Sequence, residues 1–171
     1  MARKFGQKRE ICIDPLAYNI GLIGESGIGK STVIKEVCEK LAGDDCYIAL
    51  DIGKEDGHDA INGIVSAKIP DWATFKEFCD DVIENKLTDY KDLRVIVLDT
   101  FDQLLEITEP EVIRMHNRAN PDKPKITSIK AAFGGFMAGE DKAIQIVLDK
   151  LWELKSVGVS FIAIGHTKKK D

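Results

Sequence analysis

The fold class of this chain is decided by Gly24-Glu25-Ser26-Gly27-Ile28-Gly29-Lys30-Ser31-Thr32. This stretch fits the pattern G-x-x-x-x-G-K-S/T, in which glycines turn successive backbone N–H groups toward a bound phosphate. An apolar run over 16–23 precedes it and a helical pattern follows it, as a strand–loop–helix unit requires. We therefore expect the whole stretch to bind a nucleoside triphosphate, with Lys30 reaching the β- and γ-phosphates and Ser31 binding Mg²⁺.

Apolar runs and helical patterns alternate along the rest of the chain. Strands are predicted at 16–23, 46–50, 94–98 and 159–164, and helices at 32–41, from 71 onward, and at 141–156. This alternation predicts an α/β fold of three layers, in which helices cover both faces of a mainly parallel central sheet. We expect one domain over residues 1–171, with its ligand at the carboxyl ends of the strands.

Composition narrows the class of protein further. The net charge of -5 argues against a generally basic nucleic-acid binder, although it leaves local basic patches open. The four cysteines are scattered and the three histidines complete no zinc pattern, which favours reduced thiols in a cytoplasmic protein. No signal peptide and no apolar run of membrane-spanning length is found, so we expect no membrane association.

Acidic residues follow two of the predicted strands. Asp99 ends the strand at 94–98, where an acidic residue can hold the Mg²⁺ shell opposite Ser31. The base that activates water is less defined, because residue 100 is threonine rather than the glutamate of many ATP-driven motors. The candidates are Glu55, Asp51 and Asp102, and the sequence leaves the choice among them open.

His166 follows the last predicted strand and precedes a polar end of the chain. A polar side chain there can bond the γ-phosphate and report its hydrolysis, while the alternative is a surface histidine at a strand end. The lysines at 168–170 are either a solvated tail or cations that act on phosphate across a subunit boundary or on DNA.

Residues 106–140 are expected to form a long variable loop region, because they contain three prolines and the run Phe133-Gly134-Gly135-Phe136. Basic residues interleaved with aromatic residues suit single-stranded nucleic acid, through charge and base stacking. The alternative is a surface loop whose phenylalanines are buried in the core, and the two readings stay open.

With these motifs identified, the chain resembles the RecA-like P-loop ATPases, and among them the phage nucleotide-binding (AAA-type) ATPases of recombination and single-strand annealing. The resemblance spans about residues 16 to 168. It is carried by residues 24–32, by Val95-Ile96-Val97-Leu98-Asp99-Thr100 and by Phe161-Ile162-Ala163-Ile164-Gly165-His166-Thr167-Lys168. The helix that opens at Asp71-Trp72 and the run 133–136 are also similar to that group.

The resemblance implies binding of ATP or ADP with Mg²⁺, and hydrolysis that is slow or stimulated by DNA. It further implies single-stranded DNA and phage or host recombination proteins as partners, a homo-oligomeric ring or filament, and the cytoplasm of a bacterial host. By position, Lys30 and Ser31 bind phosphate and Mg²⁺, Asp99 is the second acidic site, and His166 is the sensor.

The chain departs from that group in two places. Asp51-Ile52-Gly53 stands where RecA-like enzymes have a glutamate, and the chain ends soon after His166, as a truncated piece or a minimal core would. A nucleotide-gated binding module with little turnover therefore remains an alternative. So does a small-molecule or nucleotide kinase, although only Arg114 and Arg118 cluster as lid arginines would. No N-K-x-D sequence supports a GTPase.

Overall fold

The computed structural model describes residues 14–54 and 61–167, and within these ranges five strands form one parallel sheet. The strand order is β1-β5-β4-β2-β3. The strands are β1 (Ile20–Gly24), β2 (Tyr47–Ile52), β3 (Ser66–Ile69), β4 (Val95–Asp99) and β5 (Ser160–His166). All carboxyl ends therefore meet at one edge of the sheet, which is the edge where the sequence predicts the ligand.

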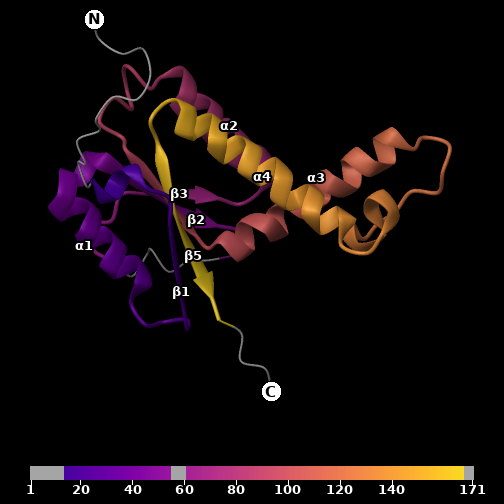
Figure 1. Ribbon diagram of the computed structural model, residues 1–171, viewed down its shortest axis with the longest axis horizontal. Coiled ribbons are helices and arrows are strands. Elements are labelled where there is room, and N and C mark those ends of the chain that lie inside the picture. Colours follow the sequence, from indigo (N-terminus) through magenta and orange to yellow (C-terminus); the bar gives the residue numbers. More distant parts are fainter. Residues whose placement is uncertain (1–13, 55–60, 168–171) are drawn as a thin grey trace, which may run out of the picture.

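Helices cover both faces of the sheet, so the expected three-layer α/β fold is confirmed (Figure 1). One face is covered by α1 (Lys30–Ala42), and the other by α2 (Trp72–Glu84), α3 (Phe101–Ala119) and α4 (Ala138–Ser156). Short 3₁₀ turns are η1 (Pro15–Ala17), η2 (Asp44–Cys46) and η4 (Ile129–Gly134). None of the helices in the described ranges combines the length and the apolar character needed to cross a bilayer.

The central strand β4 is buried on both faces, which explains its unbroken apolar sequence. Val95 and Val97 pack on the α1 side, whereas Ile96 and Leu98 pack on the opposite side. The helices on that opposite side contribute side chains at helical spacing: Phe75, Cys79 and Val82 from α2, and Val147, Leu151 and Leu154 from α4. This alternation fixes the register of the sheet between its two helical layers.

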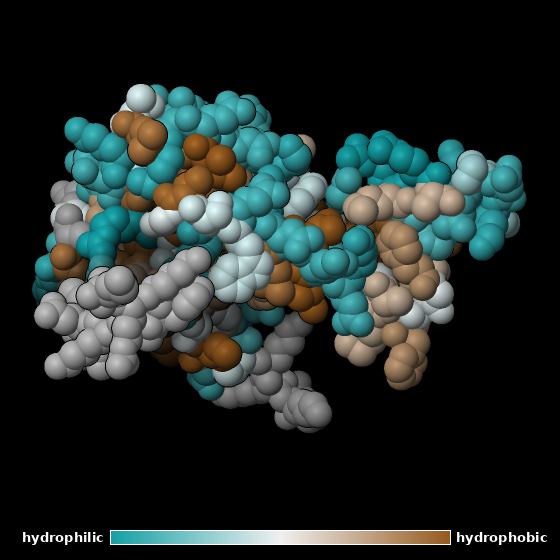
Figure 2. Space-filling model, turned by 45° about the horizontal axis from the view of Figure 1, so that its top comes forward, coloured by the Kyte–Doolittle hydropathy of each residue, from teal (hydrophilic) through white to brown (hydrophobic). Residues whose placement is uncertain are grey.

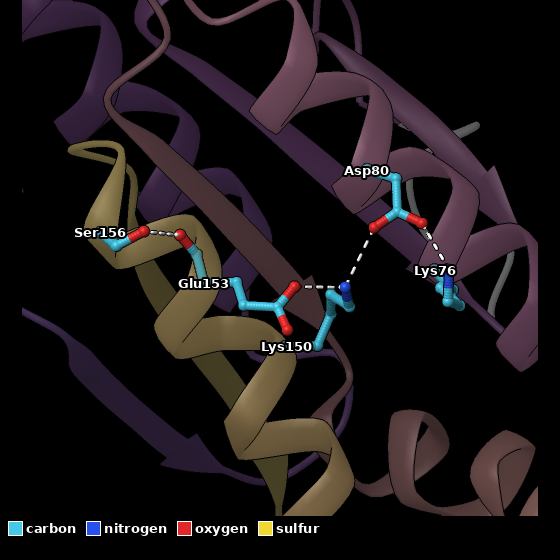
Figure 3. Close-up of polar contacts among 5 residues, drawn as sticks. All are labelled: Lys76, Asp80, Lys150, Glu153 and Ser156. Atoms are coloured by element: carbon cyan, nitrogen blue, oxygen red, sulfur yellow. Dashed lines mark hydrogen bonds and ion pairs between the residues drawn. The ribbon is translucent and has the colours of Figure 1, made fainter.

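Charged side chains also join α2 to α4 across the outer surface (Figure 3). Lys76 and Lys150 donate hydrogen bonds to the two carboxylate oxygens of Asp80, at 2.6 and 3.0 Å. These bonds, first from Lys76 and then from Lys150, lower the pKa of the Asp80 carboxyl. Lys150 also bonds Glu153, while Ser156 caps the carbonyl of Glu153 at 2.6 Å. Because the Asp80 side chain is 39% exposed, each bond stabilises the fold by at most about 1 kcal/mol.

The expectation of a long loop over 106–140 is wrong for most of that region. Helix α3 continues to Ala119 and α4 begins at Ala138, so only 120–137 connect them, and these include η4. Leu104, Thr108 and Val112 are fully buried at four-residue spacing, and this packing outweighs the break that Pro110 suggests. Pro110 lies on the exposed side, where it removes a single backbone N–H from the helical ladder.

The outer part of α3, η4 and the start of α4 form a lobe that we call the arm, residues 110–146. It projects from the sheet-containing body in Figure 1, and Figure 2 shows it as a separate lobe with a hydrophilic upper side and an apolar lower side. The arm has a small core of its own, formed by Val112, Ile129, Ala132 and Ala143.

Two strand predictions also need correction. The first strand begins at Ile20 rather than at 16, because Pro15–Ala17 form a 3₁₀ turn that is capped by the Asp14 side chain. Strand β3 was not expected. It pairs in parallel with β2 at the sheet edge, and its four residues include a lysine, so it gives no apolar run in the sequence.

Candidate functional site

The predicted phosphate-binding loop connects the end of β1 at Gly24 to the start of α1 at Lys30. Gly27 and Gly29 have φ angles of 78° and 87°, a region that side chains disfavour and that lets the backbone curl. Gly29 is the N-cap of α1, so the loop ends at the positive pole of a 13-residue helix. Curled backbone and helix N-terminus together form the usual setting for a bound phosphate.

Lys30 lies inside this loop and is only 7% exposed. Its Nζ donates to the carbonyls of Gly24 at 3.1 Å and Glu25 at 2.7 Å. The ammonium is therefore held directly over the loop by the loop's own backbone. An ammonium has three donors, so from this position Lys30 can turn one or more of them toward phosphate oxygens.

Ser31 and Asp99 meet across 68 residues of sequence. The Ser31 hydroxyl donates to Oδ2 of Asp99 at 2.5 Å, and Asp99 is 7% exposed. Hydroxyl and carboxylate oxygens are ligands that suit Mg²⁺, which takes its remaining ligands from phosphate and water. Among the described residues, no group of three or more His, Cys, Asp or Glu side chains is placed to hold a metal ion by itself.

Of the three candidates for the base, Asp51 lies on β2 in register with Asp99 on β4 and is 3% exposed. Glu55 lies outside the described residues. Thr100, where other ATPases have a glutamate, is buried and caps α3 by accepting a hydrogen bond from Gln103 N at 3.3 Å. The residue after Asp99 therefore caps the N-terminus of α3.

His166 lies at the carboxyl end of β5, in register with Gly24 of the loop. Its backbone N–H donates to Asp102 Oδ2 at 3.2 Å, and the next amide, of Thr167, donates to Gly24 O at 3.2 Å. The structure thus brings His166 beside the phosphate-binding loop. The lysines at 168–170 lie outside the described residues.

Sequence reasoning missed how the first turn of α3 contributes to this edge. The sequence indicates Asp102 only as a candidate base, although its carboxylate accepts a hydrogen bond from the backbone of β5. Gln103 was not considered, yet its Oε1 accepts from Lys54 N at 3.4 Å, just beyond β2, while its Nε2 donates to Glu106. The available signal was their position: polar residues directly after a strand-end aspartate lie at the same edge of the sheet.

The arm carries a second cluster of notable residues. Residues 112–137 contain five basic side chains and one acidic one, a net charge of +4, so the remaining residues of this -5 chain carry -9. The basic residues are all exposed: Arg114, Arg118, Lys123, Lys125 and Lys130. Arg114 forms an ion pair with Glu111.

The two phenylalanines of the arm are not buried in the core. Phe136 is 100% exposed and Phe133 is 40% exposed. Phe133 packs edge-on against His116, whose Nδ1 accepts the Phe133 backbone N–H at 3.0 Å. Asn117 holds Ile126 through two hydrogen bonds of 2.9 and 3.0 Å, which order the connection after α3. The alternative that these phenylalanines are buried in the core is therefore wrong.

Two grooves formed by other described residues lie away from the phosphate-binding loop. One groove of about 760 Å³ runs between β3 and α2, and another of about 560 Å³ lies where α2, α3 and α4 meet. Neither is lined by residues 24–32 or by Asp99. The residues with phosphate-binding chemistry lie at the carboxyl edge of the sheet instead.

Comparison with known proteins identifies the family of the chain. A search of curated proteins finds no match to the chain. A family model described as an AAA domain, a type of P-loop ATPase, matches residues 16–171. That range includes the loop at 24–32, Asp99, His166 and the whole arm. The match covers nearly all of the sequence, and the chain belongs to the AAA domain family.

Proposed function

We propose that this protein binds ATP with Mg²⁺ at residues 24–32, hydrolyses it, and couples that cycle to binding single-stranded DNA through the arm. The observation that carries the nucleotide half is the meeting of Ser31 and Asp99 beside a loop that holds Lys30. Family membership supports nucleotide binding and hydrolysis. We further propose phage-type DNA recombination or annealing as the process, in the cytoplasm of a bacterial host, with self-association on ATP and DNA.

In this proposal the chain acts mainly by positioning and by charge. The loop amides and the α1 N-terminus bind the phosphate oxygens, and Lys30 neutralises charge that builds on the β- and γ-phosphates. Ser31 and Asp99 would hold Mg²⁺, which supplies further neutralisation of phosphate charge when it is bound. Water attacks the γ-phosphorus, the bond from that phosphorus to the bridging oxygen breaks, and ADP leaves with that oxygen.

The proton released by the attacking water needs an acceptor. Asp51 and Asp102 are the candidates among the described residues, and we favour Asp51 because it is buried next to Asp99 in the sheet, while Glu55 remains a third candidate. We assign His166 the sensor role, because it lies in register with Gly24 at the loop. The His166 amide donates to Asp102 and the next amide, of Thr167, donates to Gly24, so both bonds would transmit a change at the phosphate to the neighbouring elements.

The DNA half of the proposal rests on the charge and exposure of the arm. A net charge of +4 over 112–137 in an acidic chain concentrates attraction for a phosphate backbone in one lobe. Full exposure of Phe136 offers a ring on which a base can stack, and stacking of this kind contributes about 1–3 kcal/mol per base. If all five basic residues contact phosphates, the affinity would fall with salt with a log–log slope of about -3.5.

Binding of labelled poly(dT), measured by fluorescence anisotropy, tests this half. Phe136→Ala should weaken binding by about 5- to 150-fold, whereas Phe136→Trp should retain it, since both aromatic residues stack. Leu87→Ala is a matched control, because Leu87 is 92% exposed but lies on the body. Equal affinity of Phe136→Ala and the unchanged protein, together with a flat salt dependence, would refute DNA binding by the arm.

A second candidate, a nucleotide-gated binding module with little turnover, is favoured by one observation. Thr100 occupies the position after Asp99 and is used as a helix cap, so no carboxylate stands there. Single-turnover measurements with labelled ATP separate the two candidates. Release of phosphate from bound ATP supports the ATPase, and tight binding without release supports the module.

A further inference from the structure

Two consecutive backbone amides at the end of β5 connect the phosphate-binding loop to α3. The Thr167 N–H donates to Gly24 O at 3.2 Å, and that same carbonyl accepts a hydrogen bond from Lys30 Nζ at 3.1 Å. The His166 N–H donates to Asp102 Oδ2 at 3.2 Å. The end of β5 therefore holds the loop through one amide and the first turn of α3 through the next.

Helix α3 (Phe101–Ala119) is a single helix that extends from this edge of the sheet into the arm and passes behind α4 in Figure 1. It starts directly after Asp99 and Thr100, and its 19 residues span about 28 Å. Its outer half contributes Val112 to the core of the arm, and His116 to the contact with Phe133. A packed helix moves as a unit, so a displacement of its first turn reaches the exposed side chains of the arm.

We propose that Asp102 is a positioning residue that makes α3, and with it the arm, follow the state of the phosphate-binding loop. This inference rests on the function proposed above. When phosphate binds, Lys30 turns donors from the carbonyls of Gly24 and Glu25 toward phosphate oxygens. The position of Gly24 O relative to Thr167 N changes with it, the adjacent His166 amide shifts, and the Asp102 carboxylate moves α3.

The coupling between the loop and the arm also acts from the arm to the loop, because coupling between two binding sites is reciprocal. A ligand that repositions the arm therefore changes the affinity of the loop for nucleotide by the same factor. The same turn of α3 makes a second contact with this edge of the sheet, because Gln103 Oε1 accepts a hydrogen bond from Lys54 N at 3.4 Å.

Three substitutions at Asp102 separate this role from that of a general base. Asp102→Asn retains an oxygen that can accept the His166 N–H, but it cannot take a proton from water. Asp102→Ala removes the acceptor altogether, and Asp102→Ser provides a second variant whose hydroxyl is too short to replace it. Asp102 is exposed, so these variants are expected to fold.

The experiment measures the affinity for poly(dT) with and without a non-hydrolysable ATP analogue and Mg²⁺. Hydrogen exchange at residues 129–137 in the same pair of states reports the arm without any DNA. For the unchanged protein and Asp102→Asn we expect the analogue to change DNA affinity by about 5- to 150-fold, the range of typical coupling. For Asp102→Ala and Asp102→Ser, the ratio of the poly(dT) affinities with and without the analogue should fall toward one. The analogue should still bind to these variants, but it should no longer change the hydrogen exchange of the arm.

Each other outcome contradicts a defined step. If Asp102→Ala keeps the full ratio and the full exchange response, Asp102 does not couple the two sites. If Asp102→Asn loses coupling as completely as Asp102→Ala, the acceptor argument is wrong. If the unchanged protein binds the analogue without any response in the arm, the proposed coupling is refuted, but the nucleotide site is not. Failure of the unchanged protein to bind the analogue would refute the proposed function itself.

Discussion

Replacing Gly139 by alanine should loosen the arm while leaving the nucleotide site intact. Gly139 is buried at the start of α4, where a Cβ would lie 2.2 Å from the carbonyl oxygen of Ile129 and 2.9 Å from its Cγ1. The atom closest to the new methyl group is backbone, so it cannot rotate away as a side chain would. The η4 turn would have to recede by about 1.2 Å for the 2.2 Å contact to reach an ordinary 3.4 Å.

Overpacking of a core typically lowers the free energy of unfolding by about 1–3 kcal/mol, and we expect a loss in this range for Gly139→Ala. For a domain of this size each kcal/mol lowers the melting temperature by about 2–4 °C if the arm unfolds together with the body. If the arm opens by itself, the loss appears instead as faster hydrogen exchange at 129–147. In both cases we expect the affinity for ATP to stay unchanged and the affinity for poly(dT) to fall.

Gly21→Ala is the matched control, because a Cβ on Gly21 meets no atom within 4 Å. The assay is calorimetric melting combined with hydrogen exchange of both variants. A Gly139→Ala protein with the melting temperature and the arm exchange of the control would refute the packing described for η4 and α4.

Two further predictions concern titratable groups in the body. Burial raises the pKa of the Cys38 and Cys79 thiols from 9.0 to about 12, so both should resist alkylation in the folded protein at about pH 8. Because the unfolded chain loses these protons first, the contribution of the two thiols to the free energy of unfolding should be constant below about pH 9 and fall as pH rises toward 12, which urea titrations can measure. Asp80→Asn should lower stability by less than about 1 kcal/mol, and the difference should shrink at about 1 M salt, because Lys76 and Lys150 attract an exposed charge. A larger loss that salt does not change would contradict this.

The parts of the fold that depend on continuous patterns could be predicted from the sequence. The phosphate-binding loop has a fixed spacing, and strands such as β4 are buried on both faces, so their residue types follow directly from their environment. The sheet edge that brings Ser31 and Asp99 together follows from the same pattern, because parallel strands align their carboxyl ends.

The arm could not be predicted, because its structure depends on tertiary contacts. Pro110 suggests a helix end, but the burial of Val112 and Thr108 against neighbouring elements keeps α3 helical through it. Strand β3 was missed for a related reason, since a four-residue edge strand has little apolar sequence of its own and forms by pairing with β2. The Asp102 contact with β5 joins residues 64 positions apart, which no local pattern reveals.

Hydrolysis of ATP by the purified protein, with and without single-stranded DNA, tests the central proposal most directly. Lys30→Ala is the control, because Lys30 is the buried cation of the loop. We predict turnover that DNA stimulates and that disappears, together with nucleotide binding, in Lys30→Ala. Normal ATP affinity in Lys30→Ala would contradict the placement of the site at residues 24–32, and turnover unaffected by DNA would contradict its coupling to the arm.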